Sequence, residues 1–323
     1  MTTRPAVPEP SRRSLLSPAL WGGAAAAAGL ALGALWMARR PPRRAREGMA
    51  PAARTAHGAA MERHLARRLD EAGTMLSLSV LADSAMEHYR GRFHDPFMYA
   101  APAAAALSLA RGGPGSGRRT AHGAAALTGA VGTGFHVYNV VARRESGLTW
   151  NSLFYGAPLG APAALVLAGM AGLAAAQLRV EAREGEPASI AGAPAAPLVA
   201  LGTALGLLGT TAEVALLHFR GAFQDPWMYV PVTLPPTAAL ALALTVLRPT
   251  PATIAAARRL LQATTAMGLA GAGFHAYGIH RNMGGWANWS QMLLQGPPLP
   301  APPSFTGVAL AGLGALDLME SER

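Results

Sequence analysis

Four histidines occupy matched places in two copies of one sequence pattern, and they are the residues best suited to metal or redox chemistry. The first copy runs from His88 to Tyr99 (HYRGRFHDPFMY) and recurs from His218 to Tyr229 (HFRGAFQDPWMY). Further along, the GTGFHVY string around His136 recurs as GAGFHAY around His275. The chain has no cysteine, which excludes disulfides and thiolate chemistry and leaves histidines and acids to carry such a function.

Each copy places its two histidines near the ends of helices that run in the same direction. His88 with His136, and His218 with His275, could therefore approach each other across a helical bundle. Two imidazoles are one common set of axial ligands for haem, so haem b is the cofactor that this pattern favours. Gly134 and Gly273, two residues before a histidine, would let a macrocycle approach closely; close packing of another helix is the alternative. Interhelical hydrogen bonds are the structural alternative for the histidines themselves.

Two acidic residues also recur inside apolar segments. Asp83 in the first copy matches Glu213 in the second. Ionisable groups inside a membrane segment are candidates for function, here a proton or metal relay. A protonated acid that hydrogen-bonds a neighbouring helix is the alternative that we favour for this pair.

The rest of the duplicated motif reads as a helix end, a tight loop and a helix start. Gly91 and Gly221 are predicted to supply left-handed helix caps after Arg90 and Arg220. Asp95 and Asp225, each followed by proline, are predicted to be N-caps. The six residues that we select as loop and partner-docking candidates are Arg90, Asp95, Arg220, Asp225, Trp150 and Trp289.

The composition indicates a polytopic membrane protein. Of 323 residues 51% are hydrophobic and 14% are charged, against about a quarter charged in soluble domains. The formal charge of +10 comes from arginine, and in so apolar a chain it indicates loops at a cytoplasmic membrane face rather than nucleic-acid binding.

Nine segments are long enough to be transmembrane helices, given that a crossing needs about 20 apolar residues. They cover residues 15–37, 72–89, 97–110, 121–141, 155–178, 194–219, 227–247, 260–279 and 299–318. The predicted fold is therefore an all-α integral membrane protein with one N-terminal helix and two parallel-repeat four-helix units.

The predicted parts are an N-terminal tail and first helix (1–38), a basic cytoplasmic-side segment (39–71), the first repeat (72–180), a linker (181–193) and the second repeat (194–323). With alternating loops, one side receives twice as many arginines as the other. The positive-inside rule then puts the duplicated loops on the periplasmic side of an inner (cytoplasmic) membrane. The Arg12-Arg13 pair also resembles a twin-arginine export signal, which would invert this orientation.

These features favour a membrane redox subunit that binds b-type haem and passes electrons between a periplasmic or membrane protein partner and a lipid-soluble carrier. Such a chain is a subunit of an electron-transfer complex rather than an independent enzyme. Two other functions stay open. One is a non-catalytic scaffold, anchor or assembly subunit, and the other is a small transporter or metal handler with its site between the repeats.

Overall fold

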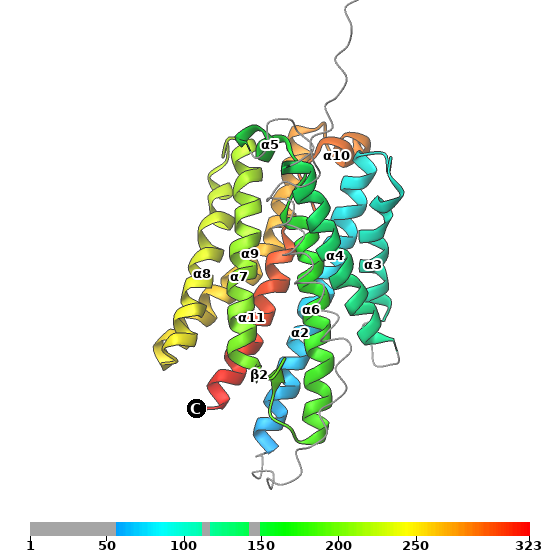
Figure 1. Cartoon of the computed structure of the whole chain (residues 1–323). Coiled ribbons are helices and arrows are strands. Elements are labelled where there is room, and N and C mark those ends of the chain that lie inside the picture. Colours follow the sequence, from blue (N-terminus) through cyan, green and yellow to red (C-terminus); the bar gives the residue numbers. More distant parts are fainter. Residues whose placement is uncertain (1–55, 112–116, 142–148) are drawn as a thin grey trace, which may run out of the picture.

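The computed structural model describes residues 56–111, 117–141 and 149–323, and in these it is all-α apart from one short hairpin (Figure 1). The prediction of an all-α chain is confirmed. The first predicted helix, residues 15–37, and most of the basic segment that follows it lie outside the described residues.

The helices follow one another in the same order in the two halves. The first half contains α2 (Ala56–Arg90), η1 (Pro96–Tyr99), α3 (Ala100–Ala110), α4 (Arg118–Val141), α5 (Trp150–Tyr155) and α6 (Gly160–Glu184). The second contains α7 (Ala195–Arg220), η2 (Pro226–Tyr229), α8 (Val230–Leu247), α9 (Pro251–Asn282), α10 (Trp289–Gln295) and α11 (Pro303–Ser321). The axes of the long helices lie roughly parallel to one another, and the short α5 and α10 lie across one end of the bundle (Figure 1).

Each half is a four-helix unit with the same neighbours. In the first, α2 and α4 both pack against α3 and α6; in the second, α7 and α9 both pack against α8 and α11. The two units meet mainly where α2 packs along α11, and also where α6 meets α7. The main hydrophobic core lies at this junction and includes Leu69, Leu173, Leu207 and Leu316.

Glycine allows the closest helix contacts within the first unit. A Cβ on Gly129 of α4 would lie 2.6 Å from the Val166 amide nitrogen of α6. In the other direction, a Cβ on Gly169 of α6 would lie 2.5 Å from the Ala126 amide nitrogen of α4. Small residues at such crossings bring backbones together, which is the usual way that helices pack in membranes.

Three of the described helices are long and apolar enough to cross a membrane. They are Gly160–Glu184, Ala195–Arg220 and the continuous η2–α8 segment Pro226–Leu247. The described residues therefore support membrane embedding but do not support nine spans. The physical reason is composition and length: α2 carries many charges, α9 carries Arg258 and Arg259, and Pro96–Ala110 is a shorter apolar helix.

Two boundaries differ from the prediction. Helix α2 begins at Ala56, so residues 56–71 are helical rather than a basic segment outside the bundle. In the linker, β1 (Ser189–Ile190) pairs antiparallel with β2 (Ala193–Pro194). Ala191 and Gly192 between them both have positive φ, the backbone that a two-residue type I′ hairpin turn requires.

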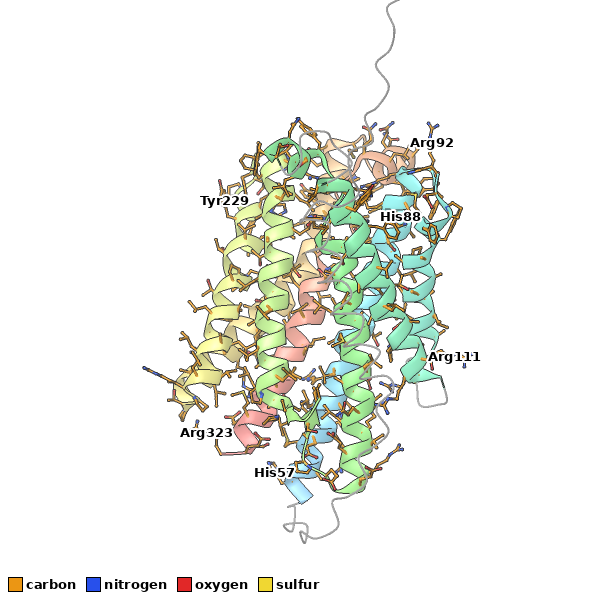
Figure 2. The ribbon with its side chains drawn as sticks, in the orientation of Figure 1. His57, His88, Arg92, Arg111, Tyr229 and Arg323 are labelled. Atoms are coloured by element: carbon orange, nitrogen blue, oxygen red, sulfur yellow. The ribbon has the colours of Figure 1, made fainter. Side chains whose placement is uncertain are left out.

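The two ends of the bundle differ in chemistry. His88, Arg92 and Tyr229 lie at one end, whereas His57, Arg111 and Arg323 lie at the other (Figure 2). We call the first the histidine end and the second the arginine end. At the arginine end, the Asp70 carboxylate of α2 forms ion pairs with Arg118 of α4 and Arg179 of α6. One acidic residue therefore links three helices.

Candidate functional site

Each of the two candidate histidines of the first unit, His88 and His136, is held by a backbone carbonyl. The Nδ1 atom of His88, at the end of α2, hydrogen-bonds the Met98 carbonyl oxygen in η1. The Nδ1 atom of His136, in α4, lies 2.5 Å from the Pro158 carbonyl oxygen just before α6. A carbonyl only accepts hydrogen bonds, so Nδ1 carries the proton in both rings.

The second unit repeats both contacts. His218 Nδ1 lies 2.8 Å from the Met228 carbonyl oxygen in η2, and His275 Nδ1 lies 2.8 Å from the Pro298 carbonyl oxygen before α11. The four imidazoles thus share one tautomer and one kind of anchor.

This tautomer leaves each Nε2 with a free lone pair. Within the described part of the chain, no hydrogen bond reaches the Nε2 atom of any of the four rings. Metal-binding histidines usually donate the proton of the other ring nitrogen to a carbonyl or carboxylate, which fixes ring orientation and raises basicity. The four anchors therefore match the arrangement expected of ligands.

The two histidines of each unit lie near each other. His88 and His136 lie close enough to interact electrostatically, and so do His218 and His275. Each pair comes from the first and third long helices of one unit, and its two histidines are far apart in the sequence. Two imidazoles with free Nε2 atoms within one unit form a candidate two-ligand site.

The helix segments that carry these rings are only partly buried. Helix α2 buries Leu69, Leu76 and Val80, yet none of its residues from Leu81 to Arg90 is buried. The same change occurs in the three other segments that carry a histidine: no residue is buried in 131–139, 212–220 or 269–278. The four segments are therefore less buried than the middle of the bundle.

The glycines beside His136 and His275 have separate roles. Gly132 and Gly271, one turn earlier on the histidine's own face, pack against the prolines Pro162 and Pro302. Gly273 has no atom within 4 Å of an added Cβ, but it lies about 200° around the helix from His275. The close helix approach is thus made by Gly271 rather than Gly273, and the space beside Gly273 is on another face.

The duplicated loop positions two of the carbonyl anchors. Asp95 and Asp225 cap the helices that follow, accepting from the Phe97 and Trp227 amides at 2.9 and 3.0 Å, with proline at the first helical position. The N-cap prediction is confirmed. Met98 lies in the capped turn η1, so this cap also fixes the carbonyl that orients His88.

The predicted left-handed glycine caps are wrong. Gly221 has φ of −81°, and the residues with positive φ are Arg92 and Phe93 in one loop and Ala222 and Phe223 in the other. The glycines lie close to methionine side chains instead: a Cβ on Gly91 would lie 3.0 Å from the Met98 Cε atom, and one on Gly221 would lie 3.1 Å from that of Met228.

Arg90 and Arg220 reach across to the opposite unit. Arg90 donates to the carbonyl oxygens of Leu293 and Gly296, both at 2.7 Å, and its guanidinium also pairs with Glu87. Arg220 donates to the Leu153 carbonyl at 2.8 Å and lies over the Phe154 ring.

The two tryptophans selected from the sequence begin the short helices that these arginines hold. Trp150 is 62% exposed and Trp289 is 60% exposed. Both belong to helices that lie across the histidine end of the bundle, α5 and α10 (Figure 1).

The two recurring acids approach each other between the units. Asp83 and Glu213 are close enough to interact electrostatically. Glu213 Oε2 accepts from the Leu159 and Gly160 amides at 3.1 and 2.9 Å, at the start of α6. Asp83 Oδ1 and Glu213 Oε1 are buried, and neither has a hydrogen-bond partner in the described ranges.

Sequence reasoning missed the carbonyl groups that orient the histidines. Backbone acceptors have no residue signature, although the Gly-x-Pro-Leu strings at 156–159 and 296–299 recur at nearly the same distance after His136 and His275. It also passed over His122, which is buried in the first unit and bonds Ser108 Oγ at 2.9 Å. His122 has no histidine counterpart in the second unit.

In the described residues, fold and site together form a duplicated helical bundle with three candidate membrane spans and two carbonyl-anchored histidines in each half. In the described ranges, no group of three or more His, Asp or Glu side chains is arranged to hold a metal ion. Comparisons with protein-family models, curated proteins and solved structures found no match to this chain.

Proposed function

We propose that this chain is a membrane-embedded electron-transfer subunit that binds one b-type haem in each four-helix unit. His88 and His136 would be the axial ligands in the first unit, and His218 and His275 in the second. The observation that carries the proposal is the shared geometry of the four rings, each anchored through Nδ1 with Nε2 free.

The residues present fit such a group. A haem needs only two protein ligands because the porphyrin supplies the other four nitrogens, and each unit offers two histidines with a free Nε2. The bound haem would supply one-electron chemistry. The chain would orient its ligands through the four carbonyls and keep the ligand nitrogens unprotonated.

We further propose that the long helices of the bundle cross the inner membrane with the histidine end on the periplasmic side. The three apolar helices belong to the same bundle as the others, and the arginines at the opposite end favour the cytoplasmic side. Electrons would then pass between a protein partner at the histidine end and a membrane carrier. Exposed Trp150 and Trp289 are candidate docking residues there.

The experiment is a reduced-minus-oxidised absorption spectrum of protein purified from a haem-replete host. We expect a Soret band and the sharp α-band of low-spin, two-histidine ligation. Alanine at any one of the four histidines removes an axial ligand, and should therefore abolish that signal for one unit only.

His94→Ala is the matched control, because His94 is exposed, lies six residues after His88 and is replaced by Gln224 in the second copy. It should leave the spectrum unchanged. A colourless wild-type protein from such a host would refute the haem proposal.

A second candidate, a proton or cation handler, is favoured by the acids between the units. Asp83 and Glu213 lie near enough to interact electrostatically where two repeats join, the usual place for a transporter site, and each keeps one buried oxygen without a partner in the described residues. A colourless protein that takes up protons or cations in vesicles, and loses this in Asp83→Asn, would favour this function.

A further inference from the structure

The two histidine pairs are connected through the arginines that cross between the units. His275 is oriented by the Pro298 carbonyl, and Pro298 lies two residues after Gly296. The Gly296 carbonyl accepts a hydrogen bond from Arg90, which belongs to the other unit. The backbone that orients a histidine of the second unit is therefore held by a side chain of the first.

The reciprocal connection is also present. Arg220, in the second unit, holds the Leu153 carbonyl at 2.8 Å. Leu153 is in α5, which leads through Gly156 to the Pro158 carbonyl that orients His136. Both glycines are in tight places: a Cβ on Gly296 would lie 3.0 Å from the Ile279 side chain, and one on Gly156 would lie 2.8 Å from that of Val140.

We propose that Arg90 and Arg220 are positioning residues that act across the repeat junction, each fixing the second histidine of the opposite unit. The inference deepens the proposed function and rests on it. Each arginine is two residues after a histidine of its own unit, so the duplicated His-x-Arg pattern connects one site to the other.

The two connections differ in strength. Arg90 uses Nε and Nη2 on two carbonyls while Nη1 pairs with Glu87. Arg220 makes one such bond, its Nε is buried without a partner in the described ranges, and Leu217 replaces the acid. The second-unit site is therefore held more firmly than the first, and the two haems are expected to be spectroscopically distinct.

The test uses full-length protein that retains one histidine pair. His88→Ala with His136→Ala leaves the second-unit pair, and His218→Ala with His275→Ala leaves the first. Arg90→Gln is added to each background. We expect it to weaken haem binding about tenfold, and to shift the reduction potential, in the second-unit site only, because losing a ligand-orienting contact costs about 10- to 100-fold in affinity.

An effect of Arg90→Gln confined to the first-unit site would overturn the proposal, since it would show that Arg90 only ends its own helix. Equal effects on both sites, or no effect, would also overturn it. Arg220→Gln should give the mirror result. Arg92→Gln is the matched control, because Arg92 is exposed and lies at the same end, and its side chain makes no hydrogen bond or ion pair within the described residues; only its backbone N–H is bonded, to the Tyr89 carbonyl.

Conservative variants separate geometry from charge. Arg220→Lys should restore the first-unit site, since one ammonium can donate to one carbonyl. Arg90→Lys should not restore the second, because lysine lacks the planar fork that donates in two directions. Full rescue by Arg90→Lys would contradict the two-carbonyl contact.

A readout without haem keeps this proposal separate from the proposed function. In [¹⁵N]histidine-labelled apoprotein, Arg90→Gln should change the Nδ1 signal of His275 and leave that of His88 unchanged. This change in a chain that binds no haem would support the coupling while refuting the haem. Unchanged Nδ1 signals in haem-binding protein would refute the coupling alone.

Discussion

At the scale of single residues, the proposal depends on the hydrogen bonds of the Nδ1 atoms as well as on the presence of four histidines, because these bonds decide which ring nitrogen is protonated. A histidine that donates from Nδ1 to a carbonyl presents an unprotonated Nε2, whereas the other tautomer would present a donor. All four rings take the first form. Met98 and Met228 lie in η1 and η2. Their carbonyls can accept the Nδ1 proton only while these turns are held in place.

The N-cap Asp95 should therefore influence the site although it lies outside it. Asp95→Ala removes the bond to the Phe97 amide, and losing such a cap costs about 1 kcal/mol. We expect weaker haem binding in the first unit with the second unit unchanged, measured by haem titration of protein that retains one pair. Asp95→Asn, which still accepts the bond, is the control; equal loss in both variants would show that the charge matters instead.

At the scale of helices, the apolar pattern located the long elements well. Predicted segments 121–141, 194–219 and 227–247 correspond closely to α4, α7 and η2–α8. The start of α2 was not predicted, because charged residues such as Arg63 and Arg67 lower the hydropathy of the segment although they are compatible with a helix. Short α5 and α10 were missed because six or seven residues give no clear periodicity.

The site could be predicted only in part, for a similar reason. Duplication singled out the four histidines as candidates, since both copies preserve the side chains. The anchoring carbonyls and the arginine contacts between units depend on tertiary packing. They could not be found from residue types.

Substitution of a helical glycine by alanine should lower or raise the Tm, depending on how closely the neighbouring helix packs against it. Gly129→Ala places a methyl group 2.6 Å from the Val166 amide nitrogen and 2.8 Å from the Pro162 carbonyl oxygen, so α4 and α6 must move apart. Overpacking of this kind costs about 1–3 kcal/mol. We expect a lower Tm in detergent for this variant.

Gly202→Ala in α7 is the comparison, because nothing lies within 4 Å of its added Cβ. Alanine is favoured over glycine inside a helix by about 1 kcal/mol, so this variant should have an equal or higher Tm. A larger loss of stability at residue 202 than at residue 129 would contradict the described crossing of α4 and α6.

At the scale of the whole molecule, the two chemically distinct ends imply an orientation. The absence of cysteine allows single-cysteine labelling in an unaltered background. Gln224→Cys at the histidine end should react with a membrane-impermeant maleimide in intact cells. Arg248→Cys, just after α8 at the opposite end, should react only after permeabilisation. The reverse pattern would support the orientation expected from a twin-arginine signal.

The haem-to-protein ratio tests the central claim most directly, namely that each unit holds its own site. We predict a pyridine-haemochrome ratio of two for the wild type, one for His136→Ala or His275→Ala, and none for the double variant, with His94→Ala unchanged. Wild-type protein without haem, or a ratio that stays unchanged in the double variant, would contradict the account.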